Sequence, residues 1–348
     1  MQIKPTGGKR IIAIVRGLAP SDMRRLAQSL VAGGITRIEV TFAQNRPECW
    51  RETCSASAAF VSAVPSHEIG QCAVNALRQY GVDTTWIRRQ GNRLGVYYVE
   101  KGASQRGSKV IYDRSGSSIA TALRKDFDWE HILEEAHWFH FTGITPALGG
   151  DLPAICMDAV QAAKAKGLMV SCDLNYRSKL WTHTEASETM GRLLPYVDVL
   201  IANEEDAKDV FGIEAENTDI QGGKLNYAGY VKVAKELSER FGCKRVAITL
   251  RSSHSASDNE WAGMLFDQGT AYFSRRYAIH IVDRVGGGDS FGAGLIHGLI
   301  CQMSSQQAID FAAAASCLKH SIEKDFNLVN KDEVLALMNG NQSGRVQR

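Results

Sequence analysis

From about residue 130 onward, the chain alternates short apolar runs with longer amphipathic ones. The short runs are typical of buried strands, and they are HWFHFTGI at 137–144, GLMVSCDLN at 167–175, VDVLIAN at 197–203 and CKRVAITL at 243–250. The longer runs between them have helical spacing, and they are DLPAICMDAVQAAKAKG, ASETMGRLLPY and NYAGYVKVAKELSERFG. Nearly continuous apolar strands that alternate with helices require a parallel sheet with helices on both faces. The sequence therefore predicts an α/β fold.

Polar side chains follow three of these predicted strands, at the point where each strand ends. They are Asp173, Asn175 and Arg177 after the second strand, Asn203 and Glu204 after the third, and Thr249 and Arg251 at the end of the fourth. In parallel sheets of this kind, ligands bind beyond the carboxyl ends of the strands. These residues are therefore candidates for a ligand site.

Residues 93–114 differ in kind from the rest of the chain. Two β-rich runs, Leu94–Val99 and Lys109–Tyr112, flank a polar turn that contains glycine. This pattern predicts a hairpin or small sheet set apart from the parallel core. The segment could be a lid over a polar ligand, although an ordinary surface hairpin fits the pattern too. Its candidate contact residues are Arg93, Tyr97, Tyr112 and Arg114.

The stretch VDRVGGGDSFGAGLIHGL at 282–299 places three glycines, Gly286, Gly287 and Gly288, directly before Asp289. The apolar residues that follow recur at helical spacing, so Asp289 is expected near the start of a helix. Free amides and the helix dipole make such a start a site for anions. A carboxylate in that place suggests phosphate chemistry with its own base. A plain loop that ends in an Asp N-cap explains the local pattern equally well.

The composition narrows the function classes. The chain has 348 residues, of which 44% are hydrophobic and 22% charged, with a net charge of +2. This balance is ordinary for a globular protein and does not predict nucleic-acid or membrane binding. The longest apolar runs are too short to span a bilayer, and the opening MQIKPTGGKR lacks the features of a secretory signal. We expect a cytoplasmic protein.

Three familiar motifs are absent or incomplete. GASQRGSK at 102–109 nearly matches a phosphate-binding P-loop, but its Ser and Lys stand in the wrong order and it lies in the predicted hairpin. The glycines at 286–288 lack the spacing of a dinucleotide fingerprint. No G-x-S-x-G elbow is present, which argues against a hydrolase.

The first 54 residues are expected to form a separate structural unit. RIIAIVRG predicts a strand, APSDMRRLAQSLVAGG a helix that begins near Ser21, and ITRIEVTF a second strand. Together they form one βαβ unit of the barrel or open-sheet kind. At the other end, residues 341–348 predict a flexible tail.

Taken together, these segments resemble the ribokinase-like family of carbohydrate kinases. The resemblance runs from about Phe60 to about Leu337, and it is closest to the branch that phosphorylates 2-keto-3-deoxygluconate. It rests on the ordered segments FVSAVPSHEIGQCAVNALRQYGVDT, RLGVYYVEKGASQR, VIYDRSGSS, DLNYRSKLW, ANEEDA, VDRVGGGDSF and CLKHSIEKDFN. The fold that it implies is a three-layer sandwich with a mostly parallel central sheet and a small β lid, spanning residues 55–340 with the lid at about 93–114.

The resemblance also implies roles for the candidate residues. Asp289 would be the base that takes a proton from the substrate hydroxyl that attacks the γ-phosphate of ATP. The amides of Gly286, Gly287 and Gly288 would hold the charge that develops on the phosphoryl group. The remaining assignments are Asp283 and Glu204 for Mg²⁺, with Asn203 organising metal and phosphates; Tyr97, Tyr112, Arg114, Asn175 and Arg177 for the sugar acid; and Thr249, Arg251 and Asn327 for the nucleotide.

The N-terminal segment departs from this family. Its kinases begin with a strand that carries a Gly-Glu pair, followed by a Gly-Gly and an Asn that hold the sugar, and none of these occurs here. Residues 11–54 instead resemble the opening of 2-keto-3-deoxy-6-phosphogluconate aldolases, with Glu39 matching an acid of those enzymes. The Schiff-base lysine and the rest of that barrel are missing, so aldolase activity is not expected.

The activity that these patterns predict is ATP- and Mg²⁺-dependent phosphorylation of 2-keto-3-deoxygluconate, impaired by the atypical N-terminus. A kinase for another sugar acid or ketose is the first alternative. A nucleotide-binding relic without catalytic activity is the second. We expect a homo-oligomer, since lids in this family often pair across a dimer.

Overall fold

The computed structural model describes residues 13–15, 38–40, 57–203, 205–215 and 226–341. The chain divides into two units, Met1–Thr53 and Cys54–Arg348. In the first unit, β1 (Ala13–Val15) pairs in parallel with β2 (Ile38–Val40). Both strands lie in the runs predicted as strands. The helix predicted from Ser21 and residues 342–348 of the tail predicted at 341–348 lie outside the described residues.

The second unit is built on a seven-stranded sheet. Its strand order is β12-β11-β10-β9-β8-β7, with β13 also paired to β11. The strands are β7 (Trp138–Thr142), β8 (Met169–Asp173), β9 (Val199–Ala202), β10 (Arg245–Ser253), β11 (Asp258–Asp267), β12 (Thr270–Phe273) and β13 (Tyr277–His280). Strands β7 to β10 run parallel, and β11 is antiparallel to its three neighbours. The mostly parallel sheet is confirmed, whereas the antiparallel part was not predicted.

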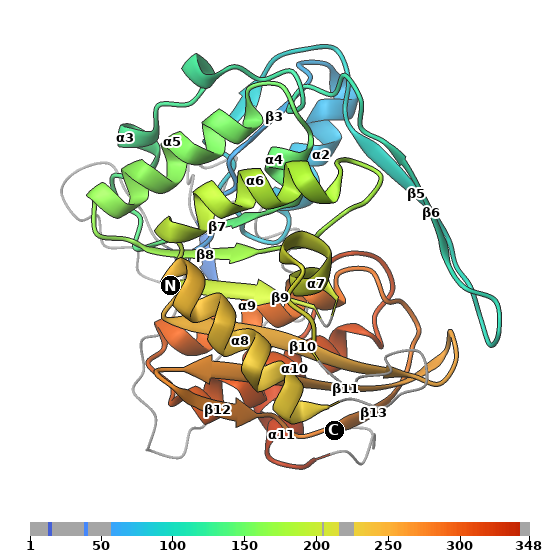
Figure 1. Cartoon of the computed structure of the whole chain (residues 1–348). Helices are drawn as coiled ribbons and strands as arrows, with labels where there is room; N and C mark the ends of the chain where they lie inside the picture. The colour runs from blue at the N-terminus through green and yellow to red at the C-terminus, as the bar shows by residue number, and fades with distance from the viewer. Residues whose placement is uncertain (1–12, 16–37, 41–56, 204, 216–225, 342–348) are drawn as a thin grey trace. The chain divides into compact units, whose positions relative to one another are not determined.

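Helices cover both faces of this sheet (Figure 1). One face packs against α5 (Leu152–Ala165), α6 (His183–Leu193) and α8 (Tyr227–Phe241), and the other against α9 (Gly287–Ile300) and α10 (Ser305–Lys319). Strand β9 shows why its run is continuously apolar. Leu200 and Ala202 join the core on the first face, while Val199 and Ile201 join the core on the second. The α/β sandwich is therefore set by strands that are buried on both sides.

Smaller elements surround this sandwich. A separate parallel pair, β3 (Ser62–Val64) and β4 (Ile87–Arg89), flanks α2 (Glu68–Arg78), and Val64, Val74 and Ile87 form its small core. The others are η1 (Arg124–Asp126), α3 (Trp129–Ile132), α4 (Ile144–Ala147), η2 (Leu194–Tyr196), α7 (Asp206–Phe211) and α11 (Lys331–Met338). No helix of the described residues is long and apolar enough to cross a membrane.

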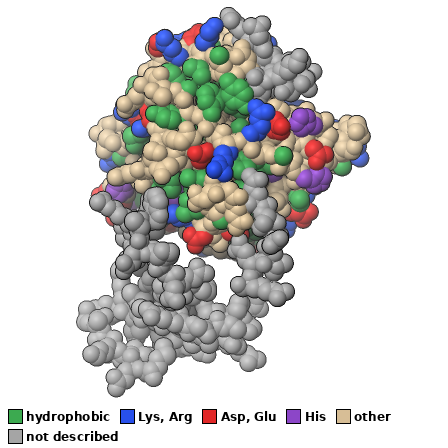
Figure 2. Space-filling view, turned by 90° about the horizontal axis from the view of Figure 1, so that it is seen from below, with side chains coloured by type: hydrophobic (Ala, Val, Ile, Leu, Met, Phe, Trp, Pro, Cys, Tyr) green, Lys and Arg blue, Asp and Glu red, His purple; other side chains and the backbone are tan. Residues whose placement is uncertain are grey.

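A hairpin of β5 (Val96–Glu100) and β6 (Lys109–Asp113) stands apart from the sheet. Figure 1 shows it as a long two-stranded ribbon that projects beyond the helices. Its register places Tyr97 opposite Tyr112. The small separate β element predicted from the sequence is therefore present, and its role as a lid stays a prediction. On the face shown in Figure 2, acidic and basic side chains are interspersed with apolar ones among the residues described there.

Asp198 joins the amino ends of three strands. It lies directly before β9 and is 4% exposed. Its Oδ2 accepts a hydrogen bond from the Val170 amide on β8 at 3.0 Å and from Lys164 Nζ at 2.6 Å. Lys244 Nζ, just before β10, lies 3.0 Å from Oδ1. Burial acts to raise the pKa of Asp198, but the two lysines and the Val170 amide outweigh it, so the pKa is lowered.

We predict that Asp198→Asn lowers the free energy of unfolding by about 1–3 kcal/mol near neutral pH, because the two lysines lose a buried negative charge and one of the two acceptor oxygens becomes an NH2 donor. The folded pKa lies below the unfolded value of about 3.9, so this stabilisation is present above that pH and is lost as the pH falls through the folded pKa. Urea unfolding of both proteins over a pH series measures it. Glu239→Gln, which removes an exposed pair with Lys235, is the control and should change little. A stability difference that persists unchanged in acid would contradict the assignment.

Candidate active site

The turn before α9 depends on Gly286. This residue adopts φ 78° and ψ 2°, the left-handed conformation that favours glycine. A Cβ at Gly286 would lie 2.2 Å from the carbonyl oxygen of Asp325, so no side chain fits there. Gly287 also has no room for a side chain, because a Cβ placed on it would lie 2.7 Å from the ring of His320. The close approach of residues 319–325 thus explains two of the three glycines, while a Cβ at Gly288 would meet open space.

Asp289 lies in the first turn of α9 and is exposed. The helix begins at Gly287, so the first amides of α9 have no partner within the helix. The predicted carboxylate at a helix start is therefore present, although the Gly287 amide donates to the Arg284 carbonyl at 3.3 Å. Such a place attracts anions through its amides and through the helix dipole.

The end of β8 brings polar groups toward Asp289. Burial raises the pKa of Asp173 well above its usual value, and the charges of Asp206 and Asp289 add to this effect while Arg177 opposes it. These four side chains are therefore close enough to interact. Asn175 adopts a positive φ of 43°, which asparagine tolerates, and its Nδ2 donates to Thr142 Oγ1 at 3.2 Å. Arg177 donates to the Tyr176 carbonyl at 2.8 Å.

Asp206 ties this loop to the one that follows β9. Its Oδ1 accepts from the Tyr176 amide at 3.1 Å, and its Oδ2 accepts from the Asn203 amide at 2.9 Å. Burial raises the pKa of Asp206, although both amide bonds act to lower it. The Oδ1 atom of Asn203 in turn accepts from the amides of Glu205 and Asp206. Both side chains are thus held by the backbone. Glu204 lies outside the described residues.

The hairpin contacts the loop that follows α10. Tyr97 donates its hydroxyl hydrogen to Asp325 Oδ2 at 2.6 Å. Burial, this bond and the charges of Asp325 and Asp289 raise the pKa of Tyr97, while Arg114 acts to lower it. The Arg114 guanidinium lies 4.7 Å from the centre of the Tyr112 ring and 5.8 Å from that of Tyr97. Tyr97, Tyr112 and Arg114 therefore form one cluster, and Asp289 is near enough to act on it.

Asp283 is held by three donors. Its Oδ1 accepts from the Val285 amide at 3.1 Å, and its Oδ2 accepts from the Lys324 amide at 3.0 Å. Lys101 Nζ, from the hairpin side, lies 2.9 Å from Oδ2. Burial acts to raise the pKa of Asp283, but these donors lower it. The three donors favour the charged form of the carboxylate, and among the described residues the Val285 amide is the recorded donor to Oδ1.

The remaining predicted residues have other neighbours. Thr249 is buried in β10 opposite Gly263, and Arg251 follows two residues later opposite Trp261. Asn327 donates to the Ala315 carbonyl at 3.1 Å and accepts from the Val329 amide. No described contact links these three to Asp289, so their nucleotide roles stay predictions.

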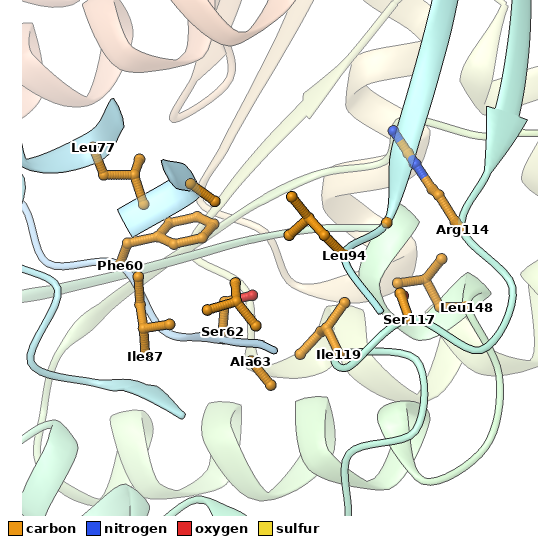
Figure 3. Close-up of a pocket in the computed structure, with 13 residues that line it drawn as sticks. Phe60, Ser62, Ala63, Leu77, Ile87, Leu94, Arg114, Ser117, Ile119 and Leu148 are labelled. Carbon is orange, nitrogen blue, oxygen red and sulfur yellow. The ribbon is translucent and has the colours of Figure 1, made fainter. Parts of the chain in front are cut away.

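A cavity of about 280 Å³ lies beside the base of the hairpin (Figure 3). Phe60, Leu77 and Ile87 line its apolar end, whereas Arg114 lies at the end next to the hairpin. Arg114 is therefore shared between the tyrosine cluster and a space that a small molecule could enter.

Asp206, Asp325 and Lys101 were not among the residues predicted for the site. Asp206 lies in ANEEDA and Asp325 in CLKHSIEKDFN, two segments that carry the family resemblance, but no local pattern indicates their contacts. Lys101 lies in the hairpin segment, and the local turn pattern does not indicate which residue it contacts. Their roles depend on contacts between segments that are far apart in sequence.

Residues 52–323 match the sequence pattern of the pfkB family carbohydrate kinase. The 2-dehydro-3-deoxygalactonokinase of Haloferax volcanii is 31% identical over 288 residues, which cover 83% of this chain and 84% of that protein. The crystal structure of 2-dehydro-3-deoxygluconokinase from Thermotoga maritima is 51% identical, with a TM-score of 0.78 over 81% of this chain and 85% of that one. A putative 2-keto-3-deoxygluconate kinase from Enterococcus faecalis is 25% identical, with a TM-score of 0.76 over 84% and 85% of the two chains.

These matches cover the sandwich, the hairpin and the glycine turn together, and they agree with the ribokinase-like fold expected from the sequence. The family match begins at residue 52 and so does not include the first unit. The chain belongs to the pfkB family of carbohydrate kinases.

Proposed function

We propose that this carbohydrate kinase transfers the γ-phosphoryl group of ATP to 2-keto-3-deoxygluconate and yields 2-keto-3-deoxy-6-phosphogluconate and ADP. The observation that carries the proposal is the position of Asp289, exposed in the first turn of α9 behind the left-handed Gly286. The names of the relatives, which are kinases of 2-keto-3-deoxy sugar acids, support this substrate class.

In this mechanism, Asp289 accepts the proton of the 6-hydroxyl group as its oxygen attacks the γ-phosphorus. A new O–P bond forms, and the bond from the γ-phosphorus to the β–γ bridging oxygen breaks, so that ADP leaves with that electron pair. The amides of Gly286, Gly287 and Gly288 stabilise the charge on the phosphoryl oxygens. Phosphoryl transfer depends mainly on positioning and electrostatics, and a helix start beside a base supplies both.

The substrate carboxylate would be held by arginine. Arg177 lies at the end of β8 near Asp173, and Arg114 lies against the hairpin tyrosines. A guanidinium can bind a carboxylate through two parallel hydrogen bonds, which a lysine cannot match. Asn175, Tyr97 and Tyr112 are proposed to contact the sugar hydroxyls. For Tyr97 this requires that its hydroxyl exchange Asp325 for the substrate or bind both.

The described residues fit a magnesium ion that is held mainly by the nucleotide. No three His, Cys, Asp or Glu side chains cluster within the described ranges. Magnesium commonly binds through one or two carboxylates, waters and substrate phosphates. We propose Asp283 and Glu204 as its carboxylate ligands, with Asn203 organising the metal and phosphates. When bound, the ion would neutralise charge on the phosphates. Thr249, Arg251 and Asn327 are proposed to contact the nucleotide.

A nucleotide-binding protein without turnover is a second candidate. The family match leaves the first 51 residues uncovered, and the sequence there carries none of the sugar-holding residues expected of the family. We propose residues 1–54 as a separate segment and 55–340 as the kinase domain. The likeness of residues 11–54 to aldolases, the homo-oligomer and the cytoplasmic location stay predictions.

An ADP-release assay over a panel of sugar acids and neutral sugars tests the proposed function. We expect turnover with 2-keto-3-deoxygluconate and little with neutral ketoses, because those lack the carboxylate. Calorimetric titration with ATP accompanies the assay. ATP binding without ADP release on any sugar would favour the non-catalytic protein, and faster turnover of a neutral ketose would favour a kinase of another substrate.

We predict that Asp289→Asn lowers kcat by about 10²–10⁴-fold while ATP still binds, because a positioned base contributes on that scale. Asp332→Asn is the matched control, since Asp332 is also exposed in the first turn of a helix, α11. Steady-state rates and ATP titration measure both variants. A near-normal kcat for Asp289→Asn would remove this residue from the role of base.

We predict that Arg177→Lys raises the KM for the sugar acid by about 5–100-fold, since the charge remains but the paired hydrogen bonds are lost. The KM for ATP should change little. Arg192→Lys, an exposed arginine in the last turn of α6, serves as the control. Equal losses for both substrates would place Arg177 at the phosphates or in the support of the fold.

A further inference from the structure

Lys319 is the last residue of α10, and its side chain is completely buried. Lysine is almost never fully buried without partners, because the charged amine loses its hydration. None of the roles proposed above uses this residue. The burial of this amine near the glycine turn therefore needs an explanation.

The ammonium group of Lys319 donates a hydrogen bond to the Ile322 carbonyl at 2.9 Å. Burial lowers the pKa of Lys319, whereas the nearby carboxylates of Asp283 and Asp325 act to raise it and the charge of Lys101 acts to lower it. The adjacent His320 does not supply a second charge, because burial lowers its pKa to about 4. Its Nδ1 donates to the Ser316 carbonyl at 2.7 Å.

Lys319 lies directly behind the glycine turn. Its Cε would be 3.2 Å from a Cβ placed on Gly286, on the side where the Asp325 carbonyl also approaches. The helix α9 begins at the next residue, and Asp289 stands in its first turn. A buried positive charge thus lies beside the amides that are proposed to hold the transferred phosphoryl group.

We propose that Lys319 is a positioning residue of the phosphoryl-transfer site: its buried ammonium holds the 319–325 segment against Gly286 and adds positive potential where charge develops on the phosphoryl group. This inference rests on the proposed kinase function. A charge in a water-excluded place acts over a longer range than one at the surface, because it is screened less. Preorganised charge of this kind favours the transition state over the ground state.

A purely structural lysine would behave differently. It would cap the turn after α10 through Ile322 and would have no effect on the chemical step once the protein is folded. Lys319→Met removes both the charge and the donor to the Ile322 carbonyl, which costs about 1–3 kcal/mol. A domain of ordinary stability still folds after such a loss. Lys319→Gln keeps an N–H donor for Ile322 while it removes the charge.

The experiment compares three variants of the full chain: Lys319→Met, Lys319→Gln and the control Lys324→Met. Lys324 is an exposed lysine of the same segment, and it is its backbone amide that donates to Asp283. The measurements are kcat and KM for both substrates, thermal unfolding, and the Kd for ATP by calorimetry without sugar.

We expect kcat to fall by about 10–100-fold in both Lys319 variants. This is somewhat less than the loss of about 10²–10³-fold in kcat that follows removal of a direct oxyanion donor. The KM for the sugar acid should stay within about twofold, and the Kd for ATP should rise by about 3–10-fold. Lys324→Met should match the unmodified chain, because its exposed charge is screened.

Several outcomes would overturn the proposal. A normal kcat in either Lys319 variant, including Lys319→Gln alone, would show that the charge is not needed for the chemical step. An equal fall of kcat in Lys324→Met would show that the effect is not specific to Lys319. Failure of both Lys319 variants to fold would assign the residue to the stability of the fold. If the unmodified chain phosphorylates no sugar, the proposed function fails instead. The ATP titration then still tests Lys319, and an unchanged Kd in both of its variants would refute it.

Discussion

The approach of residues 319–325 to Gly286 is the contact on which the site depends. The Asp325 carbonyl fills the space where any side chain at Gly286 would lie, so only glycine fits there, and glycine readily adopts the left-handed conformation of this turn. That turn starts α9 and places Asp289 at the exposed end of the helix. The same segment donates the Lys324 amide to Asp283 and offers the Asp325 carboxylate to Tyr97. A single backbone contact thus fixes the turn, the proposed base and one anchor of the lid.

The parallel sheet separates the groups that stabilise the fold from those of the site. At the amino ends of β8, β9 and β10, Asp198 joins two lysines and a backbone amide. At the carboxyl ends of β8 and β9, the half-buried Asp173 lies near the buried Asp206, and loss of hydration raises the pKa of both. Raised carboxylate pKa values are costly for stability near neutral pH, so such groups are typical of sites rather than of cores.

Much of the sandwich could be predicted because β7 to β10 are buried on both faces and therefore read as continuous apolar runs. The antiparallel strands β11 to β13 escaped prediction, since their pairing follows from a turn back along the sheet and not from strand–helix alternation. Asp289 could be predicted because the glycines and the helical spacing are local signals. Asp325 and Lys319 could not, because their contacts with Gly286 join residues 39 and 33 positions apart in the sequence.

The hairpin illustrates the same limit and shows how the site is assembled. The bond from Tyr97 to Asp325 joins residues 228 positions apart, and Lys101 reaches Asp283 from the same hairpin. Farther along the hairpin, the Ala256 amide donates to the Ser104 carbonyl. The lid is therefore attached to the loops on either side of the glycine turn. Because Arg114 packs on the tyrosines of this hairpin, a movement of the lid also moves a proposed carboxylate ligand relative to Asp289. On the proposed roles of Arg114 and Asp289, substrate recognition and phosphoryl transfer would be coupled through the contacts of this one hairpin.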